Sequence, residues 1–445
     1  MKEINKERAI ERFQMMLRKR TVSDKNGNFD REEFASFLPM LQEIYPAVFE
    51  KAEAKLINEY GILVRLKGKN PGLKPVVLMA HYDVVSDEGQ DWAHPAFEAE
   101  IHDDCIWARG AIDTKCIIAG VFEAMDRLVQ DGFTPERDIY FASSNCEEVA
   151  GDTMPKIVEW FSENNIEPWF VLDEGGAIMT SLPMGIKTPF AMVALSEKGW
   201  ATVELTATAK TAAHSAKASA AGKVSAPVKL VRALDRLDKS STPSTITPAL
   251  EGMLKSFAPY IDGPVSKVLE NISIFKPVVK KVMQTNADTA AMISSAINLT
   301  KLEAGKENGG MPDTAKATLS IKIAPQDKLS DLLVHIKKAV GEDIKINVVK
   351  SSQPPRISDY KTEAFDYISA TVKKVFPEVG VAPFILNAGT DSRHFAKICN
   401  QVYRFGAFTL DDDLFATVHS ANERMPVKDY LKCIDFYSQL ILNLN

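Results

Sequence analysis

Residues 76–83 of the chain, VVLMAHYD, form a short apolar run that ends directly before a histidine and an aspartate. The same pattern occurs twice more, in IYFASSNCEE at 139–148 and in WFVLDEGG at 169–176. A short apolar run that is bounded by polar residues predicts a buried β-strand. Each of the three predicted strands therefore ends beside ionisable side chains.

A helix is predicted between the first two of these strands, in CIIAGVFEAMDRLVQDG at 116–132. Its apolar residues Ile117, Val121, Met125 and Leu128 recur at helical spacing, and Gly132 is expected to end the helix. A strand, a helix and a second strand in this order are typical of a parallel sheet. Ligands of open parallel sheets bind beyond the carboxyl ends of the strands, which is where the histidine and the carboxylates lie.

The pattern changes after about Lys198, where alternating apolar and polar residues replace the short apolar runs. The segments ATVELTAT, KATLSIKI and INVV predict strands, and VKLVRALDRL predicts a helix. These elements indicate a small antiparallel sheet with helices on one face. After SSQPPR, the strand VYRF and a closing helix from Lys428 return to the first pattern.

We therefore predict an α/β fold in which one domain interrupts another. The catalytic domain would contain a mixed, mostly parallel sheet flanked by helices and would be built from residues 1–198 and 353–445. The inserted domain, residues 199–352, would be a smaller α+β lid. A chain of 445 residues is long enough for such a division, because single cores rarely exceed about 250–300 residues.

Composition excludes several classes of partner. The chain has 45% hydrophobic and 25% charged residues and a formal net charge of -6, so we expect no nucleic-acid partner and no membrane partner. The charged start MKEINKERAIERFQMMLRKR lacks the apolar core of a signal peptide, and no apolar run approaches the roughly 20 residues of a membrane span.

The five cysteines are scattered and include no CxxC pair. We expect reduced thiols and a cytoplasmic location.

Two ionisable residues, His81 and Asp83, directly follow the first predicted strand. Period-two alternation places their side chains on the same side of the backbone. A metal-bound histidine usually donates its other ring N–H to a carboxylate, so Asp83 is predicted to be either that carboxylate or a ligand itself. The alternative is a turn closed by polar residues.

Further carboxylates follow the same pattern. Asp113 stands just before the predicted helix, where it could bridge two cations or simply cap the helix. Glu147 and Glu148 follow the second strand, and adjacent residues of an extended segment point in opposite directions, so one could ligate a metal ion while the other handles protons. Asp173 follows the third strand and precedes two glycines, and His419 lies in a distant loop, HSANERM.

The strand-end residues and His419 together predict a metal site. Alone, each has an ordinary explanation as a turn, a cap or a surface pair, but clusters at the ends of three neighbouring strands are unlikely to arise by chance. The ligands are nitrogen and oxygen atoms without thiolate, which suits zinc and would also accept manganese or cobalt. His94, His102 and His335 are interpreted as structural or solvent-facing, and no P-loop, GxGxxG or GxSxG motif occurs.

The motifs resemble those of the co-catalytic zinc peptidase family that contains carboxypeptidase S, aminoacylase and glutamate carboxypeptidase. The resemblance spans nearly the whole chain, and the branch of carboxypeptidase S and the secreted N-acyl amino-acid hydrolases is most similar. It is carried by AHYDVV, ARGAIDTK, EEVAGD, VLDEGG, SEKG, AHS, GTDSRHF, VYRF and HSANERM.

The resemblance implies a role for each candidate metal ligand. His81 and Asp173 would bind one of two divalent metal ions, Glu148 and His419 would bind the other, and Asp113 would bridge them. Asp83 would orient His81, Glu147 would be the general base, and the peptide bond between Asp113 and Thr114 would be cis.

The resemblance also implies a substrate site shared between two subunits. His214, in the inserted domain, would reach the site of a neighbouring subunit and stabilise the oxyanion, so a homodimer through the lid is expected. Arg393 would bind the substrate carboxylate, because a guanidinium matches it with two hydrogen bonds. The surroundings of His214 depart from the family pattern: KTAA replaces a glycine-rich run, and the family's lid asparagine falls at Gly309, one residue after Asn308.

The predicted function is hydrolysis of an amide bond in a dipeptide, a short peptide or an N-acyl amino acid, with water activated by two metal ions. A hydrolase of a non-peptide amide, such as a carbamoyl compound, is the enzymatic alternative. A catalytically silent homologue that keeps the fold for binding is an alternative of a different class. The complete ligand set and the presence of Glu147 argue against that silent homologue.

Overall fold

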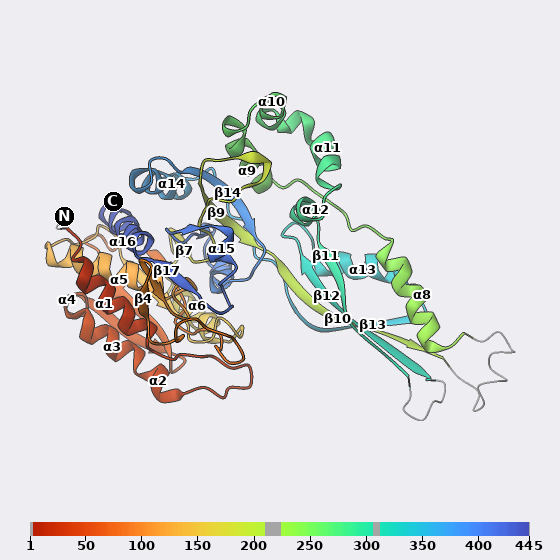
Figure 1. Ribbon diagram of the computed structural model, residues 1–445, viewed down its shortest axis with the longest axis horizontal. Coiled ribbons are helices and arrows are strands. Elements are labelled where there is room, and N and C mark those ends of the chain that lie inside the picture. The colour runs from red at the N-terminus through yellow and green to blue at the C-terminus, as the bar shows by residue number, and fades with distance from the viewer. Residues whose placement is uncertain (1–2, 210–223, 306–311, 445) are drawn as a thin grey trace. The chain divides into compact units, whose positions relative to one another are not determined.

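The computed structural model describes residues 3–209, 224–305 and 312–444, and Figure 1 shows the order of their elements. The chain divides into two compact units. The first unit comprises Met1–Ser196, Gly252–Glu270 and Ile357–Asn445, and the second comprises Glu197–Glu251 and Asn271–Arg356. The inserted domain that the sequence predicts at 199–352 overlaps the second unit, but residues 252–270 group with the first.

The first unit contains a mixed sheet in the order β1-β2-β6-β3-β7-β15-β9-β8-β16, with β14 paired to β9. The centre of the sheet is parallel: β3 pairs in parallel with β6 and β7, and β7 pairs in parallel with β15. The flanking pairs β1–β2, β2–β6, β15–β9 and β8–β9 are antiparallel. The predicted mixed α/β sheet is therefore confirmed. The strands are β1 (Ala52–Ile57), β2 (Gly61–Leu66), β3 (Val76–Met79), β6 (Ile139–Ser143), β7 (Phe170–Asp173), β8 (Ile178–Met179), β9 (Phe190–Glu197), β14 (Gly380–Leu386), β15 (Val402–Arg404) and β16 (Thr409–Leu410).

The three strands predicted from apolar runs are β3, β6 and β7, and all of their residues are buried. They are adjacent in the sheet in the order β6-β3-β7. Because neighbouring parallel strands end at the same edge, the residues that follow β3, β6 and β7 are brought together. This arrangement explains why polar groups far apart in the sequence form one site.

α5, the predicted crossover helix, packs against three other helices of the first unit, α1, α4 and α16. α16 and α1 both pack against α5, and a Cβ atom on Gly120 of α5 would lie only 2.9 Å from the Cys433 sulfur of α16, so glycine allows the close approach. The helices are α1 (Lys6–Leu17), α2 (Arg31–Ala35), α3 (Phe37–Ile44), α4 (Pro46–Phe49), α5 (Lys115–Gln130), α6 (Thr153–Glu163), α10 (Pro264–Glu270), α14 (Glu363–Val375), α15 (Asp412–Phe415) and α16 (Val427–Leu442), with the short helices η1 (Pro183–Gly185), η2 (Ala258–Tyr260) and η3 (Asp391–Lys397). A small antiparallel sheet of β4 (Glu100–His102), β5 (Cys105–Trp107) and β17 (Arg424–Pro426) completes the unit, and α9 (Pro248–Phe257) runs across the boundary in sequence between the two units.

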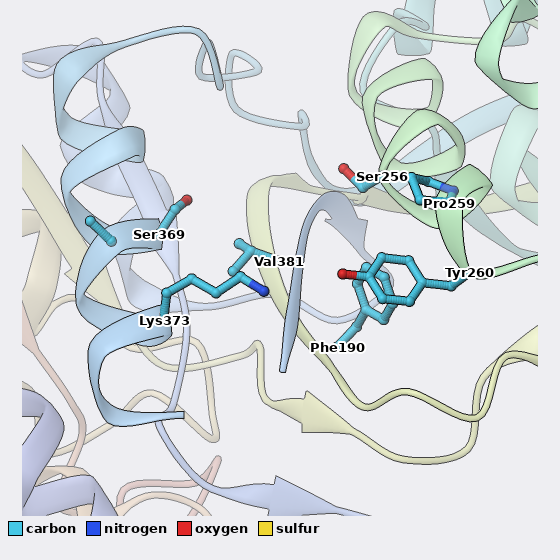
Figure 2. A pocket seen from close by; sticks show the side chains of 8 residues that line it. Phe190, Ser256, Pro259, Tyr260, Ser369, Lys373 and Val381 are labelled. Atoms are coloured by element: carbon cyan, nitrogen blue, oxygen red, sulfur yellow. The ribbon is translucent and has the colours of Figure 1, made fainter. Parts of the chain in front are cut away.

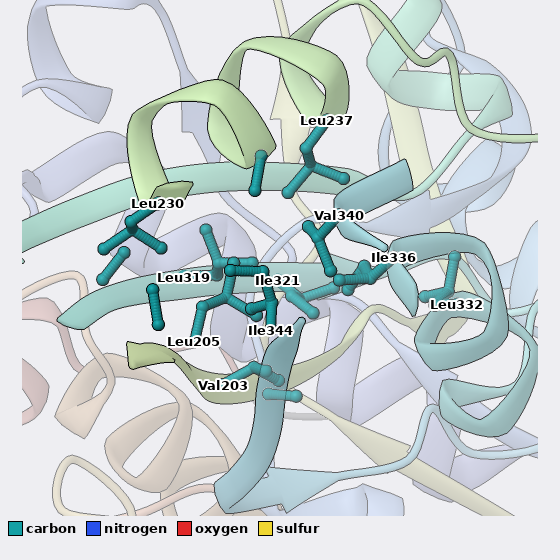
Figure 3. Packing of buried hydrophobic residues seen from close by; sticks show 14 of the residues in the cluster. Val203, Leu205, Leu230, Leu237, Leu319, Ile321, Leu332, Ile336, Val340 and Ile344 are labelled. Carbon is teal, nitrogen blue, oxygen red and sulfur yellow. The ribbon is translucent and has the colours of Figure 1, made fainter. Parts of the chain in front are cut away.

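The second unit is a four-stranded antiparallel sheet in the order β11-β12-β10-β13. Alternate residues of β10, including Val203 and Leu205, are buried and pack with Leu230 of α8 and Ile336 of α13, as Figure 3 shows. The predicted alternating strands are confirmed, whereas β11 was not predicted. The elements are α8 (Ala226–Asp238), α11 (Ile272–Met283), α12 (Ala287–Ile293), α13 (Leu329–Val340), β10 (Gly199–Thr208), β11 (Ala296–Ala304), β12 (Thr314–Ile323) and β13 (Ile344–Ser352).

Among the residues that the structure describes, no helix combines the length and the apolar character that crossing a bilayer requires.

Candidate metal centre

His81 lies just beyond the end of β3, and its side chain is only 2% exposed. Its Nδ1 atom is 2.9 Å from the backbone oxygen of Asp83 and 3.4 Å from an Asp83 carboxylate oxygen. Its Nε2 atom is 3.0 Å from Asp113 Oδ1. Contacts on both ring nitrogens hold the orientation of the imidazole.

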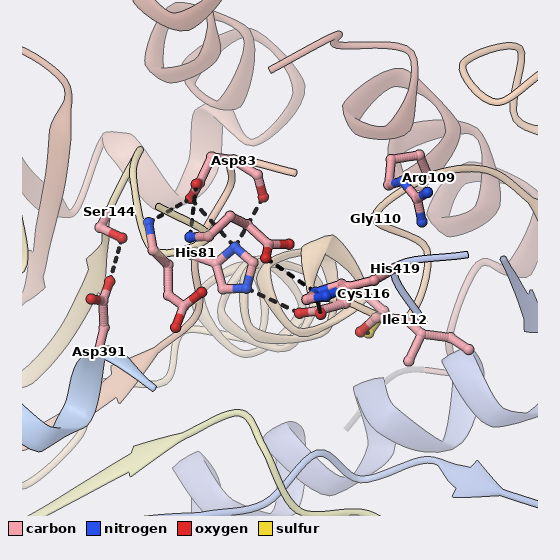
Figure 4. A network of polar contacts seen from close by, with 12 residues as sticks. His81, Asp83, Arg109, Gly110, Ile112, Cys116, Ser144, Asp391 and His419 are labelled. Carbon is pink, nitrogen blue, oxygen red and sulfur yellow. Dashed lines mark hydrogen bonds and ion pairs between the residues drawn. The ribbon is translucent and has the colours of Figure 1, made fainter. Parts of the chain in front are cut away.

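Asp113 lies two residues before α5 and contacts two histidines through different oxygen atoms. Its Oδ1 atom is 3.0 Å from His81 Nε2, and its Oδ2 atom is 2.9 Å from His419 Nε2 (Figure 4). The peptide bond from Asp113 to Thr114 is cis, which confirms the prediction. A carboxylate with one oxygen towards each histidine has the arrangement that a bridging ligand requires.

His419 completes the cluster from a loop far along the chain. Its Nε2 atom is also 3.1 Å from Glu148 Oε2, and its side chain is 52% exposed. Its backbone φ of 60° is in the left-handed region, which is uncommon for residues other than glycine. His81, Asp113 and Glu148 each offer one ligand atom, and these atoms lie within 4.8 Å of one another.

The Asp83 carboxylate connects the ends of β3 and β6. One of its oxygens accepts the backbone N–H of Glu147 at 3.1 Å, and the other accepts that of Glu148 at 3.2 Å. Asp83 is completely buried. It therefore fixes the turn on which both glutamates stand, in addition to its contact with His81.

The electrostatics of the cluster show an excess of buried negative charge. Burial raises the pKa of Glu147 and of Glu174 well above the usual range, and burial and the Asp113 charge raise the pKa of Glu148. Burial also raises the pKa of Asp391, which accepts a hydrogen bond from Ser144, to about 7. These carboxyl groups favour protonation because burial disfavours their charged form and neighbouring carboxylates add to the effect.

The two histidines respond in the opposite direction. Hydrogen bonds with Asp113 and Glu148 raise the pKa of His419 to about 10. Burial alone would lower the pKa of His81, but hydrogen bonds with Asp113 and Asp83 outweigh it and raise this pKa well above 6.5. Burial would raise the pKa of Asp113, but its bonds with the two histidines lower it. Converging nitrogen and oxygen donors with excess negative charge fit divalent cations.

Asp173 ends the strand next to β3, and Arg393 lies in the segment that is hydrogen-bonded to Asp173. Asp173 is the last residue of β7, is 2% exposed, and accepts the backbone N–H of Ser392 at 2.9 Å through Oδ2. Arg393 follows Ser392 in η3. His214 and Asn308 lie outside the described residues.

Sequence reasoning missed the buried ion pair between Glu423 and Arg109, whose side chains are both 1% exposed and 2.8 Å apart. The Glu423 carboxylate also accepts the backbone N–H groups of Gly110, Ile112 and Asp113 at 3.0, 2.7 and 3.0 Å. It therefore holds the segment that carries Asp113. The signal was present in HSANERM and ARGAIDTK, but nothing in either motif pairs one with the other.

A pocket of about 380 Å³ in the first unit is lined by none of these residues. It is lined by apolar and small polar side chains that include Phe190, Tyr260 and Val381, and Lys373 is its ionisable residue (Figure 2). The Lys373 ammonium donates to the backbone oxygen of Val379. A single cation without an acid or base partner offers no comparable chemistry, so the carboxylate cluster is the candidate site.

Comparison with known proteins places this chain in a family. Residues 77–443 match the model of peptidase family M20/M25/M40. The chain is 30% identical over 435 residues to the probable carboxypeptidase S-like 2 of Dictyostelium discoideum, covering 95% of this chain and 82% of that protein. It is also 30% identical over 431 residues to the N-fatty-acyl-amino acid synthase/hydrolase of Mus musculus, covering 95% of this chain and 85% of that protein.

Solved structures share the fold at low sequence identity. The M20 family metallo-carboxypeptidase Sso-CP2 from Sulfolobus solfataricus matches with a TM-score of 0.68 and 18% identity, covering 99% of both chains. The YXEP protein of Bacillus subtilis, a dinuclear metal binding peptidase, matches with a TM-score of 0.59 and 11% identity, covering 98% of this chain and 97% of that one. The chain therefore belongs to peptidase family M20/M25/M40 and is a metallopeptidase-type enzyme.

Proposed function

We propose that this enzyme hydrolyses an amide bond in a dipeptide, a short peptide or an N-acyl amino acid, using two divalent metal ions. The observation that carries the proposal is the Asp113 carboxylate, whose two oxygens lie 3.0 and 2.9 Å from the Nε2 atoms of His81 and His419. One ion would be held by His81 and Asp173 and the other by Glu148 and His419, with Asp113 between them. Zinc suits these ligands best, and manganese or cobalt is acceptable.

Two such cations, when bound, would lower the pKa of a water molecule and polarise the scissile carbonyl group. The remaining chemistry falls to side chains of the chain. Asp83 orients His81 through Nδ1 and fixes the backbone of Glu147 and Glu148. Glu423 and Arg109 hold the segment of Asp113 in place.

Glu147 is assigned as the general base. Burial raises the pKa of its carboxyl group, which favours proton uptake. Glu147 takes a proton from the attacking water and later passes it to the leaving amine. Its neighbour Glu148 contacts His419 instead, so the two adjacent carboxylates have different surroundings, as expected if one acts as a base and the other as a ligand.

Substrate recognition is assigned to two basic residues. Arg393 would bind the substrate carboxylate with two hydrogen bonds, supported by its place beside Ser392, which is bonded to Asp173. His214 would stabilise the oxyanion across a homodimer formed through the second unit. The relatives whose names include carboxypeptidase and N-fatty-acyl-amino acid hydrolase support substrates with a free carboxylate.

The base assignment is tested with Glu147→Gln, which keeps the shape of the side chain and removes its proton acceptor. We expect the variant to bind wild-type amounts of zinc and to lose activity by about 10²–10⁴-fold. Val149→Ala, on the same loop, is the matched control and should retain activity. A metal-loaded Glu147→Gln enzyme with the wild-type rate would show that another group is the base.

The substrate class is tested with a panel of dipeptides, N-acyl amino acids and N-carbamoyl amino acids, each assayed with zinc, manganese and cobalt. Hydrolysis of either of the first two classes, and its loss when the substrate carboxylate is amidated, is the expected result. Turnover of N-carbamoyl compounds alone would replace the proposed substrate. The absence of any hydrolysis by metal-loaded protein would favour a silent homologue.

A further inference from the structure

The small sheet of the first unit presents two histidines and a glutamate together. β4 and β5 form a hairpin whose two connecting residues, Asp103 and Asp104, both have positive φ, as two-residue hairpin turns of type I′ require. Glu100 and His102 are two residues apart on β4, so their side chains lie on the same face of the strand. The strand therefore fixes the spacing of one carboxylate and one imidazole.

A second imidazole, from His94, packs against this pair. The rings of His94 and His102 are parallel to within 11°, with centroids 3.6 Å apart. His94 Nδ1 is 3.5 Å and His102 Nε2 is 2.8 Å from the same oxygen atom, Oε2 of Glu100. Two ring nitrogens thus converge on one carboxylate oxygen.

We propose that His94, Glu100 and His102 form a binding site for one divalent transition-metal ion of the zinc, copper or nickel class, separate from the cluster around Asp113. The three donor atoms lie within 4.8 Å of one another. Two imidazoles and one carboxylate are the ligands that these ions prefer, and they leave a fourth position for water.

The distances from each histidine to Glu100 are close to those that such an ion requires. Donors about 2.0–2.1 Å from a tetrahedral zinc ion are about 3.3–3.4 Å from one another. The His94–Glu100 distance of 3.5 Å is about 0.1 Å longer than this range, and the His102–Glu100 distance of 2.8 Å, now that of a hydrogen bond, needs to lengthen by about 0.5 Å. Side-chain rotation in Glu100, whose side chain is 44% exposed, is sufficient for this change.

Neighbouring contacts hold the two histidines in position. Trp107 on β5 packs its edge against the His94 ring, with centroids 4.8 Å apart, and donates its indole N–H to the backbone oxygen of His102 at 3.1 Å. The side chains of His94 and His102 are 27% and 41% exposed, so an ion can reach them from solvent. Packing therefore keeps the donors close together before any ion binds.

Binding one ion requires a change in the ring stack. The lone pair of an imidazole nitrogen lies in the plane of its ring, so two parallel rings cannot both point at one ion. One ring must turn out of the stack when the ion binds, and the partial exposure of His94 and His102 allows this movement.

Binding at this site would act on the loop that carries His419. Ala93, next to His94, donates its backbone N–H to Asn422 Oδ1 at 2.7 Å, and Gln90 donates to the backbone oxygen of His419 at 3.1 Å. An ion that joins His94 to β4 would hold residues 90–94 in place. The site is therefore expected to support the loop of His419.

The test counts zinc in the full-length protein. Wild type, His94→Gln and His102→Gln are equilibrated with zinc chloride, freed of unbound metal, and analysed by inductively coupled plasma mass spectrometry. His335→Gln, the same substitution at a histidine whose Nε2 contacts Ser240 in the second unit, is the control. We expect each ligand variant to hold one zinc ion fewer per chain than wild type and the control to hold the same number.

Crystals of the wild type, with diffraction recorded at the zinc absorption edge, supply a second readout that needs no variant. An anomalous peak between the donors of His94, Glu100 and His102 is expected. Equal zinc content in all four proteins, or zinc elsewhere in the crystal without this peak, would overturn the proposal. The difference between proteins does not depend on how many ions the Asp113 cluster holds, so the result is independent of the proposed hydrolase activity.

Discussion

Replacing Glu423 by glutamine tests how the segment that carries Asp113 is held. The native carboxylate accepts four hydrogen bonds, from Arg109 at 2.8 Å and from the backbone N–H groups of Gly110, Ile112 and Asp113 at 2.7–3.0 Å. Glutamine keeps one acceptor oxygen and turns an NH₂ group towards the remaining donors. It also leaves the Arg109 charge, 1% exposed, without a counter-charge at this position.

The cost follows from these contacts. Removing one partner of a buried ion pair destabilises a protein by about 3–5 kcal/mol. A buried N–H donor that loses its acceptor costs about 1–3 kcal/mol, and this cost is included in the about 3–5 kcal/mol for the ion pair. Displacement of Asp113 should also weaken metal binding by about 10–100-fold, the usual effect of losing a group that orients a ligand.

The assay is urea unfolding of the metal-free protein, followed by activity measured against free zinc concentration. Glu159→Gln, an exposed glutamate paired with Lys156, is the matched control and should change neither quantity measurably. The double variant Glu423→Gln with Arg109→Met should lose less stability than the sum of the single variants, because it removes the uncompensated charge. A Glu423→Gln protein within about 0.5 kcal/mol of wild type would refute the reasoning.

Three further predictions concern separate parts of the molecule. Asp83→Asn should lower kcat by about 10–100-fold at saturating metal, because its amide cannot accept the N–H groups of both Glu147 and Glu148; an unchanged kcat would contradict this. Burial lowers the pKa of His394 from 6.5 to about 4. Between these two pH values the unfolded chain binds more protons than the folded chain. The free energy of unfolding should therefore fall by at most about 3 kcal/mol as pH falls from 6.5 to 4. His394→Asn should reduce this loss, as measured by urea unfolding across that range. Leu319→Ala, in the buried core of the second unit, should lower the free energy of unfolding by about 2–5 kcal/mol. Lys316→Ala, on the exposed face of the same strand, should lower it much less.

Local sequence patterns were sufficient for most elements of the fold. Short apolar runs predicted β3, β6 and β7, and alternation predicted β10 and β12, because burial on both faces or on one face of a sheet dictates these patterns directly. β13 is mostly exposed and was predicted from the short apolar segment INVV. β11 was missed because its residues are mostly exposed, so its sequence lacks a clear alternation. The grouping of residues 252–270 with the first unit was also missed, since it depends on contacts with segments distant in the chain.

The sequence by itself determined which residues are candidates for the metal centre: His81, Asp83, Asp113, Glu147 and Glu148 stand in motifs that follow strands or precede a helix, and His419 stands in a loop motif. Only the tertiary structure decided how they face one another, with one Asp113 oxygen towards each histidine and Glu148 beside His419. The same holds for Glu423 with Arg109 and for His94 with His102, which looked structural or solvent-facing in the sequence. The physical reason is that a motif records the surroundings of its own segment, whereas a hydrogen bond across 310 residues exists only after the sheet has brought both segments together.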